Sequence, residues 1–166
     1  MLYTQSLKAS QALEYLTKEK MAVLSTLSGY GTVDSAAIFF MADEKFNFYF
    51  TTKIGTRKYQ SLSGNPVVSL TIANADQLKT VEVKGIASVI TDSAEIARRI
   101  TDLINLHRQE GVPWAPPIAK LSAGHFAVVK VTPTWLRFGI FKNEEPAGEY
   151  FTQIIPDEPA KHAGLS

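Results

Sequence analysis

Short apolar runs separated by turn-forming residues follow one another along most of the chain, and this pattern predicts a protein built mainly from β-strands. In several runs apolar and polar residues alternate with the period of two that a half-buried strand requires; Val81 and Val83, for example, flank Glu82. Glycine, proline, asparagine and aspartate mark the turns between the runs. We predict strands at 21–27, 33–42, 46–52, 67–72, 78–90, 125–131 and 134–141.

Helical spacing and helix-end signals predict three helices beside these strands. The second helix has Thr56 as its candidate N-cap, and Gly64 and Pro66 end it. The third begins with a capping box at 92–95 and is predicted to stop at Gly111. The predicted helices cover 6–20, 57–63 and 92–111.

The order of the elements favours an antiparallel barrel. About six or seven strands follow one another mostly without the crossover helices that parallel sheets require. We expect a mainly β protein with flanking helices, in which 1–155 form one domain and 156–166 a loose C-terminal tail. Within it, Pro133 is predicted to separate the last two strands, and Gly85 to mark a bulge.

The second predicted strand differs from the others because its centre, 36–42, is apolar without alternation. Such a strand is typically buried on both faces. In a chain of this size one face can pack against the core. The other face therefore requires a partner subunit or a ligand.

Composition excludes several classes of function. The net charge of +1 across 166 residues gives no general attraction to nucleic acid or anionic lipid. The chain has no cysteine, which rules out thiol catalysis, disulfides and cysteine-bound metal and is compatible with a reducing cytoplasm. No signal peptide or membrane-length apolar run is present, and the three histidines lie far apart. We expect a cytoplasmic protein without a metal site, whose histidines are structural or solvated.

The residues at the start of the second helix have the chemistry of a phosphate site. A helix N-terminus attracts anions, and Arg57 and Lys58 add a guanidinium and an ammonium group. Thr56 adds a hydroxyl, and Thr51 and Thr52 at the end of the preceding strand can add two more. Nearby phenylalanines provide an apolar wall for a ring. The same residues are also compatible with a solvated basic turn capped by threonine.

The stretch 46–70, FNFYFTTKIGTRKYQSLSGNPVVSL, resembles the core signature of the pyridoxamine 5′-phosphate oxidase-like, FMN-binding split-barrel superfamily. That signature is a strand ending in an aromatic residue and threonine, then Gly-Ser/Thr-x-Lys, a leucine, Asn-Pro and an apolar strand. A looser similarity extends over 13–140. The matching residues are Phe50, Thr52, Gly55, Thr56, Lys58, Leu62, Asn65 and Pro66.

The resemblance implies a six- to seven-stranded antiparallel split β-barrel that binds FMN as a homodimer, with flavin at the subunit interface. It implies that Arg57 and Lys58 bind the phosphate beside Thr56, and that Thr52 lies near the ribityl chain. It further implies a flavin contact from Thr80 and contacts across the dimer from Trp135 and Arg137. The second-strand residues that it places along the isoalloxazine edge are Ser35, Ala36, Ala37 and Ile38.

Some residues depart from the family pattern, and these departures affect the expected substrate but not the expected fold or cofactor. Enzymes of this kind that oxidise vitamin B6 carry an arginine at the start of the second-strand motif and an arginine-histidine-arginine set near the C-terminus. This chain has Asp34 at the first place and lacks the second set. The leading hypothesis is an FMN-dependent oxidoreductase with an unidentified small-molecule redox substrate. The alternatives are a non-catalytic flavin-binding or stress-response module, a deazaflavin-binding or haem-binding relative with His125 or His162 as the axial ligand, and a plain structural or interaction domain.

Overall fold

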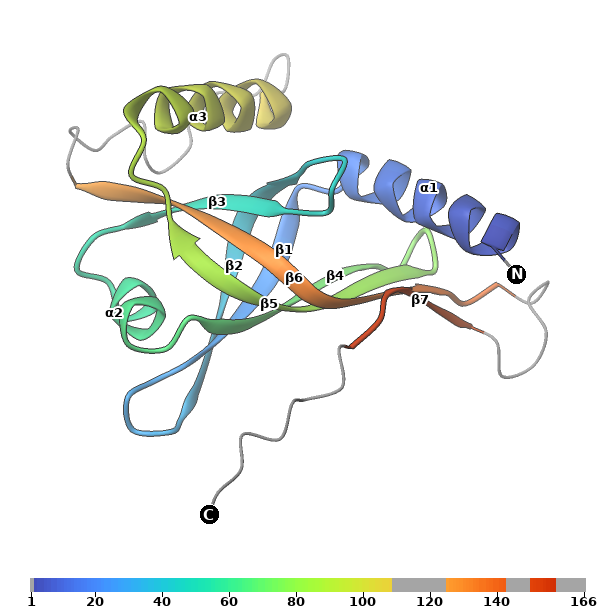
Figure 1. The fold of residues 1–166 in the computed structure, drawn as a ribbon, viewed down its shortest axis with the longest axis horizontal. Coiled ribbons are helices and arrows are strands. Elements are labelled where there is room, and N and C mark those ends of the chain that lie inside the picture. Colours follow the sequence, from blue (N-terminus) through green and yellow to red (C-terminus); the bar gives the residue numbers. More distant parts are fainter. Residues whose placement is uncertain (1, 109–124, 143–149, 158–166) are drawn as a thin grey trace.

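Six antiparallel strands close into a barrel, and one more strand and three helices surround it in the described part of the chain (Figure 1). The structure is a computed structural model that describes residues 2–108, 125–142 and 150–157. The helices are α1 (Leu2–Lys18), α2 (Arg57–Gly64) and α3 (Ser93–His107). The strands are β1 (Met21–Leu27), β2 (Val33–Ala42), β3 (Phe48–Lys53), β4 (Val67–Asn74), β5 (Lys79–Val89), β6 (Phe126–Ile140) and β7 (Phe151–Ile155).

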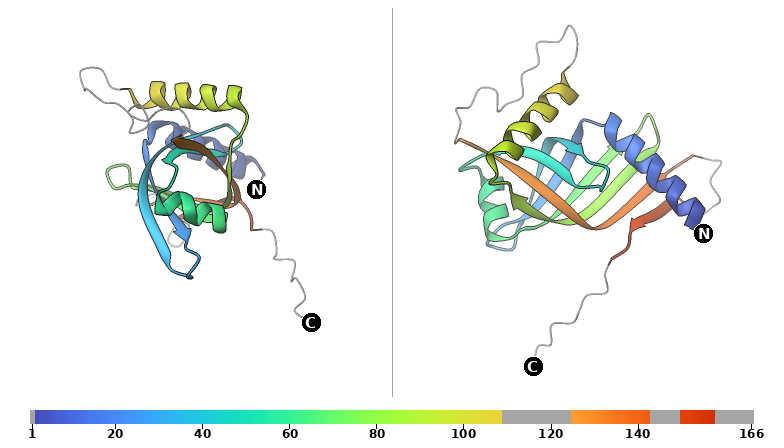
Figure 2. Two further views of the ribbon diagram at one scale, coloured as in Figure 1. Left: turned by 90° about the vertical axis from the view of Figure 1, so that its left-hand side faces the viewer. Right: turned by 45° about the horizontal axis from the view of Figure 1, so that its top comes forward.

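The barrel closes through the pairing of β3 with β6. The strand order is β3-β2-β1-β4-β5-β6-β7, and β3 pairs with β6 along its other edge. Helix α2 lies across one opening of the ring of strands, and α1 lies toward the other end (Figures 1 and 2). The predicted mainly β fold, a six- to seven-stranded antiparallel split barrel with flanking helices, is confirmed.

Large apolar side chains fill the inside of the barrel. Phe40, Phe48 and Phe50 are completely buried, and the rings of Phe40 and Phe48 have centroids 5.8 Å apart. Tyr15 of α1 is also buried in this core, and its hydroxyl donates a hydrogen bond to the backbone carbonyl of Lys79, 3.3 Å away. Each such side chain contributes about 1.5–3 kcal/mol by its burial. Helix α1 is therefore part of the core and not an appendage.

Strand β6 continues through Pro133, so the prediction that this proline separates two strands is wrong. Pro133 pairs with Gly85 of β5 at the point where the register of the two strands shifts, and the predicted bulge at Gly85 is confirmed. A bulge interrupts the ladder of hydrogen bonds, so it tolerates a proline, which has no N–H to donate. A Cβ atom at Gly85 would lie 2.7 Å from the backbone oxygen of Thr132. This close approach explains why the bulge contains glycine.

Several other details differ from the prediction, among them the bounds of α1 (Leu2–Lys18 against 6–20) and the end of β4 (Asn74 against 72). Strand β3 begins at Phe48 instead of Phe46, because Phe46 has a φ of 61° and belongs to the preceding turn. Helix α3 ends at His107, whereas its predicted end, Gly111, lies outside the described residues. Strand β7 is absent from the prediction and pairs with β6. Most of the predicted C-terminal tail, 158–166, also lies outside the described residues.

One part of the outer barrel surface is apolar and exposed. Ile38 and Phe40 on the inner face of β2 are buried, whereas Val33, Ser35 and Ala37 on its outer face are exposed in a single chain. The strand registers align four exposed apolar residues in one row across β2, β1, β4 and β5. This outer row consists of Val33, Leu27, Val67 and Ile86, which are between 36% and 69% exposed.

A buried histidine fixes the end of α3 to the barrel. The Nε2 atom of His107 donates a hydrogen bond to the backbone carbonyl of Phe40, 2.9 Å away, and the imidazole meets the ring of Phe39 edge-on. Burial lowers the pKa of His107; the hydrogen bond to Phe40 opposes this effect, and the nearby charge of Lys20 adds to it. The structural role predicted for this histidine is confirmed.

The lowered pKa of His107 predicts a loss of stability in acid. Between the lowered pKa of the folded state and the unfolded value near 6.5, the unfolded chain binds more protons, so the free energy of unfolding falls as the pH decreases. Urea denaturation at pH 7.5 and 5.5 measures the slope. We expect a smaller decrease in His107→Gln, whose amide can donate to Phe40 without titrating in this range. Equal slopes in the variant and the original protein would contradict the prediction.

Candidate functional site

Local sequence shapes the turn from which α2 begins. Gly55 has a φ of 85°, which glycine adopts without strain. The Oγ1 atom of Thr56 accepts a hydrogen bond from the backbone N–H of Tyr59 at 3.3 Å and donates one to the carbonyl of Lys53 at 2.8 Å. The predicted N-cap is thus confirmed. The remaining N–H groups of the first turn and the positive end of the helix dipole favour an anion at this point.

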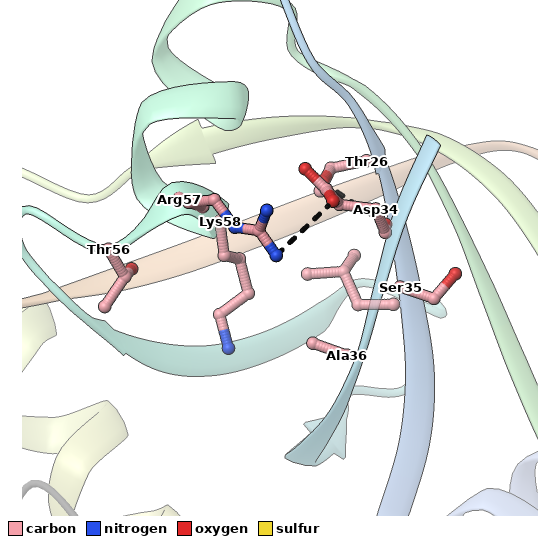
Figure 3. Close-up of a pocket in the computed structure, with 8 residues that line it drawn as sticks. Thr26, Asp34, Ser35, Ala36, Thr56, Arg57 and Lys58 are labelled. Carbon is pink, nitrogen blue, oxygen red and sulfur yellow. Dashed lines mark hydrogen bonds and ion pairs between the residues drawn. The ribbon is translucent and has the colours of Figure 1, made fainter. Parts of the chain in front are cut away.

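A pocket of about 380 Å³ lies between this helix start and the hairpin of β1 and β2 (Figure 3). Helix α2 and its cap contribute Thr56, Arg57 and Lys58, which the sequence predicts as a phosphate site. Strand β2 contributes Ser35 and Ala36, which are also predicted cofactor contacts. Five predicted residues that are separated in the sequence therefore meet in one place. The full lining is Leu24, Thr26, Asp34, Ser35, Ala36, Thr56, Arg57 and Lys58.

The two cations of the pocket have different surroundings. The side chain of Arg57 is 86% exposed, and its Nη2 atom lies 3.8 Å from Oδ1 of Asp34. Lys58 is half-buried, with its Nζ atom 6.0 Å from the centroid of the Phe50 ring, and burial lowers the pKa of this lysine. The Arg57 side chain extends from α2 toward Asp34 of β2, whereas that of Lys58 points in a different direction (Figure 3). An anion in the pocket can therefore contact a solvated guanidinium and a less solvated ammonium group.

The hydroxyls of the β1–β2 hairpin differ in their relation to the pocket. Thr26 lines it, and its Oγ1 atom donates to the backbone carbonyl of Asp34 at 3.5 Å. The hydroxyl of Ser35 points away from Arg57 and Lys58 (Figure 3) and lies 2.9 Å from the Oγ atom of Ser25. In the described part of the chain the pocket thus combines cations, hydroxyls, one carboxylate and the apolar side chains of Leu24 and Ala36. This donor set suits a ligand that has a phosphate, a polar linker and an apolar portion.

Four predicted contacts lie near the pocket but are not part of its lining. Thr52 is buried, with its Oγ1 atom 3.4 Å from that of Thr56, and Thr51 precedes it in β3. Ile38 belongs to the core, and Ala37 lies on the exposed outer face of β2.

The prediction lacks Leu24, Thr26 and Asp34. The pairing of β1 with β2 places Leu24 opposite Ala36 and Thr26 opposite Asp34. The hairpin register was therefore the signal that could have found all three.

Thr80, Trp135 and Arg137 belong to the neighbouring strands β5 and β6 and lie in a different part of the fold. Thr80 lines a second pocket of about 380 Å³, whose lining also includes Glu82. The Nη2 atom of Arg137 lies 2.7 Å from Oε2 of Glu82, and its guanidinium lies over the rings of Phe151 and Trp135. None of the three predicted residues lines the pocket at α2. A single chain therefore does not bring the two predicted groups together.

The two described histidines lie in different parts of the fold. His107 is the buried last residue of α3, and His125 is exposed just before β6. His162 lies outside the described residues. The described residues contain no group of three or more His, Asp or Glu side chains placed to hold a metal ion. Nor does any helix among them have both the length and the apolar character needed to cross a membrane.

Most of the chain matches a known protein family. Residues 9–138 match the pyridoxamine 5′-phosphate oxidase family. No curated protein matches the chain significantly. The matched residues include the whole of the pocket lining, from Leu24 to Lys58.

Solved structures that resemble this chain carry several different names. An F420 reductase shares 22% identity over 74% of this chain and 94% of its own, with a TM-score of 0.59. General stress protein 26 from Bacillus anthracis shares 18% identity over 77% of this chain and 91% of its own, with a TM-score of 0.59. A haem-binding protein from Mycobacterium smegmatis shares 14% identity over 87% of this chain and 56% of its own, with a TM-score of 0.66. At these identities the likeness shows the fold.

Proposed function

The chain belongs to the pyridoxamine 5′-phosphate oxidase family, and from this premise we propose that it is an FMN-binding flavoprotein of the oxidoreductase type that acts on a small molecule. The observation that carries the proposal is the meeting of Thr56, Arg57 and Lys58 with the β2 residues Ser35 and Ala36 in one pocket. We further propose that it works in the cytoplasm, in keeping with a chain that has no cysteine.

The residues of the pocket fit the parts of FMN. Arg57 can grip two phosphate oxygens with its planar fork, Lys58 adds a point charge, and the start of α2 adds N–H donors. The hydroxyl of Thr56 suits the ribityl chain. Bound flavin would supply the redox chemistry. The part of the chain described here would bind the phosphate, orient the ring along β2 and exclude water from one side.

A second copy of the chain is the proposed partner. The pocket at α2 has cations but lacks a large aromatic surface, whereas Trp135 and Arg137 on the outer side of β6 offer rings and a cation. The outer row defined above is apolar and exposed in one chain. A homodimer that covers this row would bury it, and it would allow Thr80, Trp135 and Arg137 of the partner subunit to complete the flavin site.

Two other cofactors are compatible with the fold, because proteins of similar structure are named as an F420 reductase and a haem-binding protein. A deazaflavin with a phosphate in its side chain could use the same Arg57 and Lys58. For haem, His125 is exposed and is a possible axial ligand in the described residues. A non-catalytic flavin module or a stress-response protein would share the flavin site; reduction of the bound flavin by a reduced nicotinamide, followed by turnover, would distinguish the enzyme from these.

An absorption spectrum of the purified protein tests the proposed cofactor. We expect a yellow protein with the two absorption bands of an oxidised flavin, because the pocket supplies anion contacts and the proposed dimer would supply ring contacts. Denaturation should release FMN, identified by chromatography against FMN and FAD standards. A colourless protein that also fails to bind added FMN would overturn the proposal. A single deazaflavin band or a Soret band would replace FMN with one of the other cofactors.

A further inference from the structure

A carboxylate lies inside the pocket that is suited to an anion. Asp34 lines this pocket together with Arg57 and Lys58, and its Oδ1 atom lies 3.8 Å from Nη2 of Arg57 (Figure 3). Two positive charges and one negative charge therefore face the same space. A site built only to maximise the attraction for phosphate would not contain this carboxylate.

Asp34 is held in position more firmly than its cationic partner. It belongs to the ladder of β1 and β2, where it pairs with Thr26, and its backbone carbonyl accepts a hydrogen bond from the Thr26 hydroxyl. The Asp34 side chain is 32% exposed, whereas Arg57 is the first residue of α2 and is 86% exposed. An ion pair with so exposed an arginine contributes little to stability. A phosphate can consequently take over Arg57, whereas the strand ladder keeps the backbone of Asp34, and with it a negative charge, at the pocket.

We propose that Asp34 determines the specificity of the pocket by limiting the negative charge that it accepts. The inference rests on the proposed function and deepens it. A ligand with one phosphate and an uncharged, hydroxyl-bearing neighbour fits, since the two cations balance the phosphate and Asp34 can accept hydrogen bonds from hydroxyls. A ligand with a second anionic group beside the first places that group against the carboxylate. FMN meets this limit, and a diphosphate such as that of FAD does not.

The test compares inorganic phosphate with pyrophosphate by isothermal titration calorimetry at low ionic strength. The variants are Asp34→Asn, which keeps the shape of the side chain, and Asp34→Ser, which suits a strand. The control is Asp76→Asn, an equal change of charge at an exposed turn residue outside this pocket. Removal of the carboxylate should raise the affinity for pyrophosphate relative to that for phosphate about five-fold, because the repulsion between Asp34 and the ligand grows with the ligand's charge. Low ionic strength keeps this repulsion from being screened. The control should keep the original ratio.

Two outcomes would overturn the role of Asp34. One is an unchanged ratio in both Asp34 variants, and the other is a weaker affinity for FMN in Asp34→Asn than in the original protein. Failure of the proposed function would be seen in the original protein, in its binding of FMN. If the original protein binds phosphate but not FMN, the flavin proposal falls while the measured ratio still decides the role of Asp34. If it binds neither phosphate nor pyrophosphate, the role of Asp34 falls, and binding of FMN still decides the flavin proposal.

Discussion

Simultaneous replacement of Arg57 and Lys58 by alanine is expected to weaken FMN binding at least about 100-fold. A charged hydrogen-bond donor contributes about 1.5–3 kcal/mol to a complex, so the loss of two donors corresponds to at least about two powers of ten in the dissociation constant. The fold should survive, because alanine favours a helix and Arg57 is almost fully exposed. Quenching of flavin fluorescence measures the affinity, and thermal unfolding checks the fold.

A double variant at two other exposed cations provides the matched control. Lys45→Ala with Arg98→Ala changes the net charge from +1 to −1, just as the first double variant does, but removes no residue of the pocket. Its affinity for FMN should stay within about three-fold of the original, since charges beyond a Debye length are screened. Equal affinities in all three proteins would place the phosphate elsewhere and remove the observation on which the flavin proposal depends.

The phosphate end of the site was predictable because its determinants are local. Gly55, Thr56, Arg57 and Lys58 follow one another, and the rules of helix capping place them at the start of α2 without knowledge of the rest of the fold. The barrel itself was predictable from strand periodicity. Both predictions use interactions between residues that are close in the sequence.

The errors arose where two strands meet. Pro133 is compatible with a continuous strand because the register with β5 shifts beside it, between Lys84 and Gly85, which leaves Thr134 without a partner residue in the ladder. No local pattern around the proline reveals that shift. Asp34 reaches the pocket because the register of the β1–β2 hairpin places it beside Thr26, and its charge has the opposite sign to that expected at a phosphate site. The pairing between strands therefore determined the position of Pro133 and Asp34, which the local sequence pattern did not reveal.

The second large expected effect concerns the outer row, because a dimer formed through this row would bring Thr80, Trp135 and Arg137 of one chain to the pocket of the other. Val67 lies near the middle of this row, is 55% exposed and lines neither of the two pockets described above. In a two-fold symmetric dimer the same surface faces its counterpart, so one substitution acts twice. Val67→Asp would bury two unpaired carboxylates, each at a cost of several kcal/mol. We expect the dissociation constant of the dimer to rise at least about 1000-fold.

Analytical ultracentrifugation at micromolar concentration measures the oligomeric state of this variant, with Leu7→Asp as its control. Leu7 is 50% exposed on α1, outside the outer row, and the change in side chain is the same. The control should remain a dimer and keep its flavin, whereas Val67→Asp should be a monomer and bind FMN weakly. If Val67→Asp stays dimeric, the outer row is not the interface. If it is monomeric with undiminished FMN affinity, the pocket at α2 is sufficient by itself, and Thr80, Trp135 and Arg137 have no role across the dimer.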